Sequence, residues 1–158
     1  WTSFAAIAMP GEASREEQRG LIIAEPAGRY ATRPPLVADC SVLASVLFDE
    51  PDRDTAAAAL RGHELYAPDL VDHELVSVAV KKSRLGLEEV AAQGLADLKR
   101  LQLTRCAVDV EAQRQLALRQ DLTAYDAAYL WLAAELGAPL ATFDATLGAA
   151  AERYLKGD

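Results

Sequence analysis

Four acidic residues, far apart in the sequence, occupy positions where an α/β domain would bring them together. Each follows a short apolar run or lies in the opening turns of a predicted helix: Asp39, Glu74, Asp126 and Asp144. Carboxylates crowded into a cleft of low polarity repel one another, and proteins usually keep them together by binding a cation. Ligands that are all oxygen favour a hard ion such as Mg²⁺ or Mn²⁺. Because such an ion activates water beside a phosphodiester, the pattern predicts metal-dependent phosphodiester hydrolysis.

Each acid also has an ordinary structural interpretation. Asp126 suits the first turn of a helix, where a carboxylate meets free N–H groups and the positive end of the helix dipole. Glu74 fits a solvated helix position equally well. Asp39 is harder to explain in this way, because it directly follows the apolar run Leu-Val-Ala and precedes a helix. The prediction therefore depends on the four acids as a set.

The segment that delivers two of these acids has clear start and stop signals. Thr123 is a predicted N-cap, and the following helix is expected to be apolar on more than one side, with Tyr125 and Leu136 among its apolar residues. Gly137 suits the C′ position, and Pro139 prevents the helix from continuing. The run 140–143 is then short and apolar enough for a covered parallel strand, which places Asp144 at its carboxyl end.

The rest of the chain alternates between short apolar strands and helices. Strands are predicted at 36–38, 64–68 and 103–108, and helices at 41–48, about 52–61, 70–83, 87–101, 110–119 and 149–156, with Asp69 as an N-cap. This alternation predicts an α/β fold, a three-layer α/β/α sandwich with a short, mainly parallel central sheet. In such sheets the site lies at the carboxyl ends of the strands, where Asp39 and Asp144 fall.

Composition limits the remaining possibilities. The 158 residues are 51% hydrophobic, which is enough for one core, predicted at 36–158 after an arm or linker at 1–35 rich in Gly, Pro, Ala and charge. The net charge of −8 argues against a protein that coats nucleic acid through bulk charge. Two cysteines without a CxxC motif fit a reducing cytoplasm. No run approaches the ~18 apolar residues of a membrane span, so no membrane association is expected.

Four pieces of the sequence resemble the PIN-domain nucleases, and within them the VapC-type toxins of bacterial toxin–antitoxin pairs. The pieces are VADCSVL around Asp39, APDLVDHEL around Glu74, LTAYDAAY around Asp126 and APLATFD ending at Asp144. The resemblance covers about residues 36–147. It departs from the usual pattern at Ser77, where an amide side chain is frequent, and in the arm, which has no counterpart in the usual compact toxin.

The resemblance implies a metal-dependent endoribonuclease in which the four acids hold Mg²⁺ or Mn²⁺. Ser41 and Thr142 would be hydroxyl supports near the ions, and the protein would form a homodimer with a cognate antitoxin. Because an acidic domain gains little affinity from counterion release, we expect recognition of a structured RNA through a small basic patch. The densest basic run, Lys81, Lys82 and Arg84, is the candidate, although it also fits a solvated helix end.

Two other functions remain open. An aspartate-based phosphoryl-transfer enzyme also places Asp after a first strand, but it requires a second acid close to Asp39 and a lysine after a later strand, and neither is evident. A catalytically silent PIN-like binding module is the non-enzyme alternative.

A further hypothesis concerns the arm at 1–35. Leu21-Ile22-Ile23 would anchor it to a folded surface, and Arg29 or Arg33 would pair with acids of the cleft and so block the site. The simpler interpretation is an arm that braces a dimer.

Overall fold

The computed structural model describes residues 33–157. Within this range the chain forms four strands and seven helices. In chain order they are β1 (Pro35–Ala38), α2 (Cys40–Leu47), α3 (Arg53–Leu60), β2 (Glu64–Pro68), α4 (Val71–Arg84), α5 (Glu88–Arg100), β3 (Leu103–Cys106), α6 (Val110–Gln120), α7 (Ala124–Leu136), β4 (Leu140–Ala141) and α8 (Ala145–Lys156).

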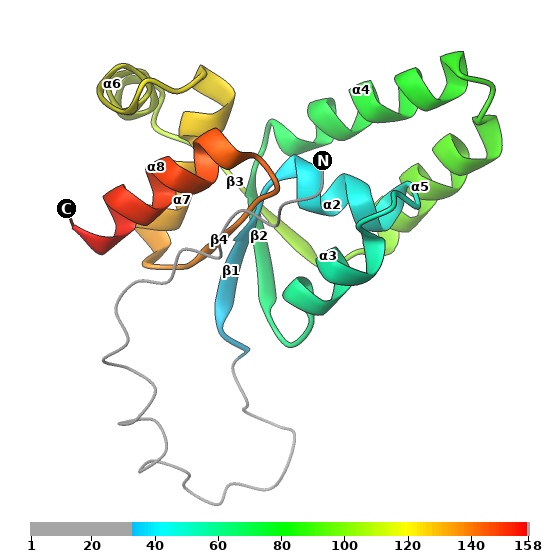
Figure 1. Ribbon diagram of the computed structural model, residues 1–158, viewed down its shortest axis with the longest axis horizontal. Helices are drawn as coiled ribbons and strands as arrows, with labels where there is room; N and C mark the ends of the chain where they lie inside the picture. The colour runs from blue at the N-terminus through cyan, green and yellow to red at the C-terminus, as the bar shows by residue number, and fades with distance from the viewer. Residues whose placement is uncertain (1–32, 158) are drawn as a thin grey trace, which may run out of the picture.

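The four strands form one parallel sheet in the order β3-β2-β1-β4 (Figure 1). β1 and β4 are adjacent although about a hundred residues separate them in sequence, and Val37 pairs with Leu140. Because both strands run in the same direction, the residues that follow them emerge at the same edge of the sheet. The sheet therefore brings Asp39 and Asp144 to one edge, as the sequence predicts.

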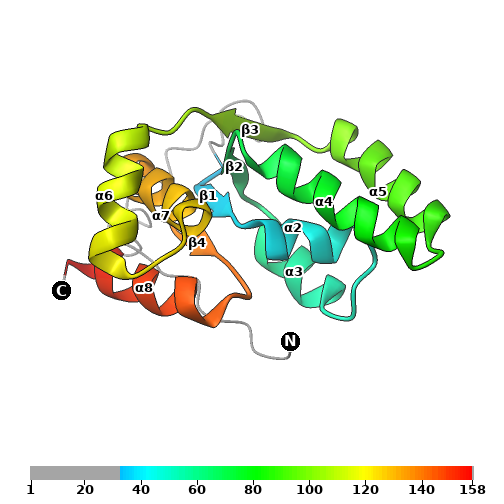
Figure 2. The same cartoon turned by 90° about the horizontal axis from the view of Figure 1, so that it is seen from above.

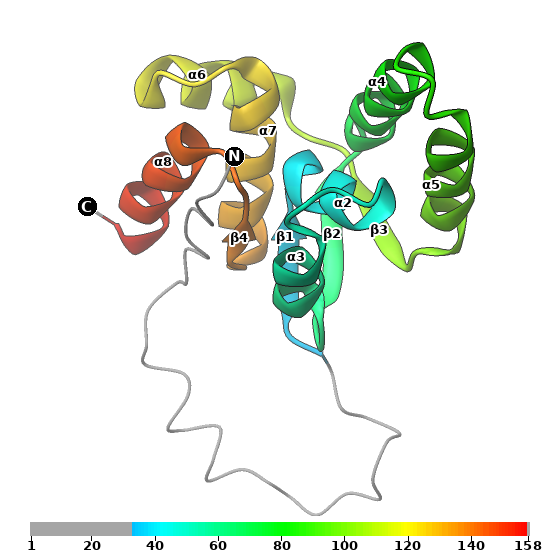
Figure 3. The ribbon, with the colours of Figure 1, turned by 45° about the vertical axis from the view of Figure 1, so that its right-hand side comes forward.

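Helices cover both faces of the sheet. α6, α7 and α8 lie on one side, and α2, α3, α4 and α5 lie on the other, which is clearest in Figure 3. Seen from above, α4 and α5 form an antiparallel pair that extends away from the sheet (Figure 2). α7 packs against β1, β2 and β4. This arrangement confirms the predicted α/β fold with helical layers on both sides of a parallel sheet.

The core explains why α7 and β1 carry continuous apolar runs. Leu36, Val37 and Ala38 of β1 are fully buried, and so are Tyr129 and Leu130 of α7. A buried parallel strand has no solvent side, so its sequence does not alternate between apolar and polar residues. The two elements that carry Asp39 and Asp126 are therefore anchored in the core.

A close approach fixes α2, the helix that follows Asp39. Gly94 of α5 lies against the Phe48 ring at the end of α2, and a Cβ atom at this position would collide with that ring and with the Leu47 carbonyl. Phe48 is itself almost fully buried. The glycine therefore lets α5 pack directly onto the end of α2.

The structure corrects several predicted boundaries. β3 ends at Cys106 and β4 at Ala141, so both strands are shorter than predicted, and α8 begins at Ala145 rather than at 149. Asp69 is not the N-cap of α4; that position belongs to Leu70, which makes no side-chain capping bond. Instead, the Asp69 backbone N–H donates to the carbonyl of Cys106.

α7 is buried on more than one side, as predicted, but two of the apolar residues expected in the core are exposed. Tyr125 is 62% exposed and Leu136 is 38% exposed, although the helical spacing placed both on the apolar side. Both residues lie in the terminal turns of α7. Thr123 does cap the helix as predicted, and Gly137 ends it in the left-handed conformation.

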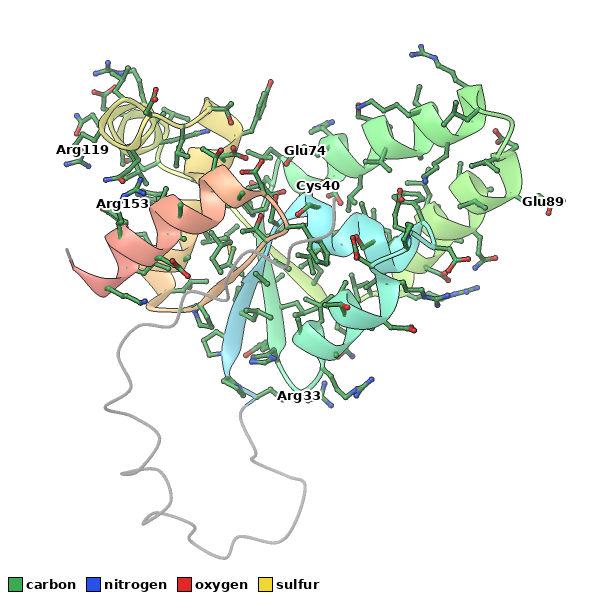
Figure 4. The ribbon with its side chains drawn as sticks, in the orientation of Figure 1. Arg33, Cys40, Glu74, Glu89, Arg119 and Arg153 are labelled. Carbon is green, nitrogen blue, oxygen red and sulfur yellow. The ribbon has the colours of Figure 1, made fainter. Side chains whose placement is uncertain are left out.

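The hypothesis that Leu21-Ile22-Ile23 anchors the arm, with Arg29 pairing with the acids, falls outside the described residues. Arg33 is described, and its place argues against pairing with the acidic site. It precedes β1 and lines a cavity of about 1250 Å³ at the amino ends of β2 and β3, the opposite edge of the sheet from Glu74 (Figure 4).

No helix within residues 33–157 is long and apolar enough to cross a membrane.

Candidate active site

Asp39 lies at the turn from β1 into α2 and is only 5% exposed. Its backbone N–H donates to the Ala141 carbonyl at 3.0 Å, which extends the pairing of β1 with β4. The carboxylate oxygen Oδ2 accepts two hydroxyl hydrogen bonds, from Thr142 at 2.7 Å and from Ser41 at 2.8 Å. These two bonds fix the orientation of a carboxylate that would otherwise be costly to bury.

The two hydroxyls also join the ends of β1 and β4. The Ser41 oxygen accepts from the Phe143 backbone N–H at 3.0 Å, and the Thr142 oxygen accepts from the Asp144 backbone N–H at 2.9 Å. Each hydroxyl therefore donates to Asp39 and accepts from the segment that leads to Asp144. Ser41 and Thr142 lie beside the predicted site, and their contacts are to Asp39 and to this backbone.

Glu74 lies in the first turn of α4, in the helical layer opposite α7. Its Oε1 atom accepts a hydrogen bond of 2.7 Å from the hydroxyl of Tyr129 on α7. Figure 4 shows Glu74 beside Cys40, the first residue of α2. Glu74 is therefore held at the same edge of the sheet as Asp39.

The other two acids are at helix starts. Asp126 is in the first turn of α7, and its backbone N–H donates to the Thr123 hydroxyl at 3.1 Å. Asp144 is exposed and is the N-cap of α8, with Oδ1 accepting from the Leu147 N–H at 2.8 Å. The sequence placed Asp144 after a strand but did not reveal this capping bond, because the helix begins four residues earlier than predicted.

The four carboxylates interact electrostatically. Burial raises the pKa of Asp39, against the hydrogen bonds from Thr142 and Ser41, and the charge of Asp144 raises it further. Burial raises the pKa of Glu74, and the charges of Asp39 and Asp126 act in the same direction. Burial raises the pKa of Asp126 to about 6, with further contributions from Asp144 and Asp39. The structure thus brings all four predicted acids into one electrostatic neighbourhood.

Divalent-cation binding fits the chemistry of these residues. Within residues 33–157 none of the four carboxylates forms an ion pair with Lys or Arg. In the same range no three carboxylate, imidazole or thiol groups stand close enough together to enclose an ion. The oxygen-only donors and their uncompensated charge suit a hard cation, which would have to draw the carboxylates closer together.

Two charged contacts of α4, one at each end of the helix, were not apparent in the sequence. Arg105 of β3 makes a bidentate pair with Asp72 in the first turn of α4, at 2.7 and 2.8 Å. Lys82 pairs with Glu50 at 2.6 Å, so one of the three predicted basic residues has a carboxylate partner within the protein. Neither pair has a local sequence signature, since the partners are about thirty residues apart.

Stability measured without metal should depend on pH through these acids. The folded-state pKa of Asp126 is about 6 against an ordinary value of 3.8, so between these pH values the folded protein holds a proton that the unfolded chain has released. We therefore expect the free energy of unfolding in EDTA to decrease as the pH rises from about 4 through about 6. Urea unfolding across this range measures the slope.

Asp126→Asn is the control, because it removes the titrating group and should flatten the pH dependence of unfolding. The raised pKa values of Asp39 and Glu74 act in the same direction and should leave part of the slope. A free energy of unfolding that increases with pH over this range would contradict the coupling between the acids.

A parallel sheet covered by helices on both faces, with acids at the carboxyl edge, defines an α/β domain with an acidic site. Residues 36–153 match the family described as PIN domain. Ribonuclease VapC3 of Pyrobaculum aerophilum is 34% identical over 119 residues, which cover 71% of this chain and 91% of that protein. Ribonuclease VapC9 of Mycobacterium tuberculosis is 35% identical over 116 residues, covering 71% of this chain and 87% of that protein.

A solved structure supports the same fold. The crystal structure of PAE2754 from Pyrobaculum aerophilum matches with a TM-score of 0.59 and 21% identity, over 75% of this chain and 80% of that chain. The chain belongs to the PIN-domain family. Within that family it is similar to proteins named ribonuclease VapC, which confirms the resemblance inferred from the four sequence pieces.

Proposed function

We propose that this chain is a divalent-metal-dependent endoribonuclease that acts as the toxin of a toxin–antitoxin pair. The observation that carries the proposal is the set of four electrostatically coupled carboxylates at the carboxyl edge of the sheet, in a PIN domain similar to proteins named ribonuclease VapC. The catalytic domain would comprise residues 36–158. A cognate antitoxin and a homodimer belong to the same proposal, and both follow from the likeness to VapC proteins.

The four acids would hold Mg²⁺ or Mn²⁺, which supplies activation of water and neutralises the leaving oxygen. Asp39 would be the central ligand, because Ser41 and Thr142 already fix its carboxylate. Glu74 and Asp126 would approach from the two helical layers. Asp144 would act from the rim, since it is exposed and one of its oxygens caps α8.

The phosphoryl-transfer alternative finds no support at the ends of the strands. That chemistry needs a lysine after a later strand, but the residues following β2, β3 and β4 are Asp69, Ala107 and Thr142. A catalytically silent module remains the non-enzyme alternative. It would have no need for three carboxyl groups, those of Asp39, Glu74 and Asp126, whose pKa values are raised by burial and by neighbouring acids, because this lowers stability at neutral pH.

The experiment that tests the function is cleavage of labelled RNA with Mg²⁺ and then with EDTA. We propose a structured RNA as the substrate, so a hairpin should be cut at one or few places and a homopolymer much more slowly at the same salt concentration. No cleavage of any RNA with Mg²⁺ or Mn²⁺ would favour the silent module. Equal cleavage in EDTA would refute the metal requirement.

Lys81 is the stronger candidate for a phosphate contact among the three basic residues. It is exposed, and its charge reaches the site: burial, Glu74 and Asp39 raise the pKa of the Cys40 thiol, and Lys81 opposes them. Lys82, by contrast, is bound to Glu50. In the hairpin assay we expect Lys81→Ala to weaken RNA binding and to reduce its salt dependence by about one counterion.

Lys82→Ala provides a matched comparison from the adjacent position. It should lower stability slightly through the loss of the Glu50 pair while leaving the salt dependence of RNA binding nearly unchanged. If both variants bind the hairpin like the wild type, the basic run of α4 is a solvated helix end, and RNA contacts must lie elsewhere.

A further inference from the structure

The hydroxyl of Tyr129 makes a partly buried contact between the two helical layers. Tyr129 lies on α7, one turn after Asp126, and is fully buried in the core. Its hydroxyl donates to Oε1 of Glu74 at 2.7 Å, and Glu74 is 55 residues away on α4. The hydrogen bond therefore joins the helix that carries Asp126 to the helix that carries Glu74.

This bond constrains the carboxylate of Glu74 in addition to its attachment to α4. A glutamate side chain has several rotatable bonds, and fixing it costs conformational entropy. The Tyr129 ring is locked by the surrounding core, so its hydroxyl offers a donor at one fixed position. With Oε1 engaged by this donor, the orientations open to the other oxygen, Oε2, are restricted.

A second contact holds the same turn of α4 in a different way. Arg105 binds both oxygens of Asp72, two residues before Glu74. That pair fixes the start of the helix against β3 but does not touch the Glu74 carboxylate. The two contacts therefore allow the position of the helix to be separated experimentally from the orientation of its carboxylate.

We propose that Tyr129 is a positioning residue that orients Glu74 toward the bound cation. The inference rests on the proposed function, because it assumes that Glu74 is a metal ligand. Hydrogen bonds to ligating carboxylates orient them, and loss of such a partner typically lowers metal affinity or activity 10- to 100-fold. Tyr129→Phe keeps the ring in the core and removes only the oxygen.

The test measures Mn²⁺ affinity of the full chain directly, by titration, and RNA cleavage separately. We expect Tyr129→Phe to bind Mn²⁺ about 10- to 100-fold more weakly than the wild type. Its kcat should fall while KM for RNA stays nearly unchanged, because Tyr129 is fully buried and presents no surface to a substrate. Tyr125→Phe removes an exposed hydroxyl one turn earlier and should match the wild type in every measurement.

Two further variants distinguish positioning from a general structural role. Arg105→Gln loosens the start of α4 and should lower the unfolding temperature in EDTA with a smaller loss of Mn²⁺ affinity than Tyr129→Phe. In a Glu74→Gln background, Tyr129→Phe should cause little additional loss of Mn²⁺ affinity, because its target is already lost. A purely structural role would instead give the same loss in both backgrounds.

The possible failures are distinguishable. If the wild type binds Mn²⁺ and Tyr129→Phe matches it within about twofold, the positioning role is wrong and the proposed function stands. If Tyr129→Phe weakens Mn²⁺ binding equally with Glu74 and with Gln at position 74, the residue acts through the fold and the inference also fails. If the wild type neither binds Mn²⁺ nor cleaves RNA, the proposed function fails and the inference falls with it.

Discussion

Replacing Asp39 with asparagine should abolish metal-dependent RNA cleavage while leaving the metal-free protein at least as stable as the wild type. The substitution deletes the most buried of the proposed metal ligands. The loss of cleavage activity should therefore exceed the roughly 10- to 100-fold loss that follows removal of a residue that only hydrogen-bonds a ligand. The asparagine carbonyl can still accept hydrogen bonds from Ser41 and Thr142. Cleavage assays with Mg²⁺ and thermal unfolding in EDTA measure the two effects.

The reason for unchanged or increased stability is electrostatic. Burial raises the pKa of Asp39, and Asp144 raises it further, so the ionised form of the carboxyl is disfavoured in the fold. A neutral amide of the same shape avoids that cost. Activity and metal-free stability should therefore move in opposite directions, which is uncommon for a buried substitution that simply damages the core.

Asp69→Asn is a suitable control for Asp39→Asn. Asp69 also directly follows a strand at the carboxyl edge of the sheet, but its side chain is exposed. Its bond to the Cys106 carbonyl is made by the backbone N–H and does not depend on the carboxylate. Its substitution should leave RNA cleavage close to that of the wild type. Wild-type cleavage by Asp39→Asn would show that the acids at this edge are not the metal site.

Much of the fold follows from local signals in the sequence. Thr123 caps α7, Gly137 ends it in a left-handed conformation, and Pro139 then leads into β4. These residues act through their own backbone geometry, so they can be interpreted without knowledge of the tertiary structure. The positions of Asp39 and Asp144 follow in turn, because parallel strands end at one edge of a sheet.

The parts that could not be predicted depend on contacts between distant segments. Asp69 has the residue type of an N-cap, but its backbone N–H donates a hydrogen bond to the carbonyl of Cys106 on β3. The helix begins after Leu70, which makes no side-chain capping bond. Tyr129 lies at an apolar helical position whether or not its hydroxyl finds a partner. The sequence pattern is the same in both cases, and only the fold brings Glu74 to that oxygen.

The same limitation applies to Arg33. A cation near the start of the domain can pair with the acids in principle, because the sequence alone does not show at which edge of the sheet it lies. β1 runs from Pro35 to Ala38, so the residue before the strand and the acid after it are at opposite edges of the sheet. Pairing of Arg33 with the acidic site would require it to cross the length of the strand.

Thr142→Val should be the most damaging substitution among the residues that support the acids. The Thr142 hydroxyl is fully buried, donates to Asp39 and accepts from the Asp144 backbone N–H. Valine has nearly the same shape but can do neither, so it leaves buried polar groups unsatisfied. We expect a loss of about 1–3 kcal/mol in the free energy of unfolding. RNA cleavage should decrease about 10- to 100-fold, because Asp39 loses a partner that orients it.

Thr142→Ser separates the hydroxyl from the methyl group. Serine keeps both hydrogen bonds and loses one methyl, which costs about 1 kcal/mol of stability through lost burial and should leave cleavage nearly intact. Both variants should therefore lose stability in urea unfolding, but only the valine variant should lose hairpin cleavage. If the valine variant cleaves RNA as well as the serine variant, the hydroxyl does not orient Asp39 for catalysis, and the contact between Thr142 and Asp39 serves only to stabilise the junction of β1 and β4.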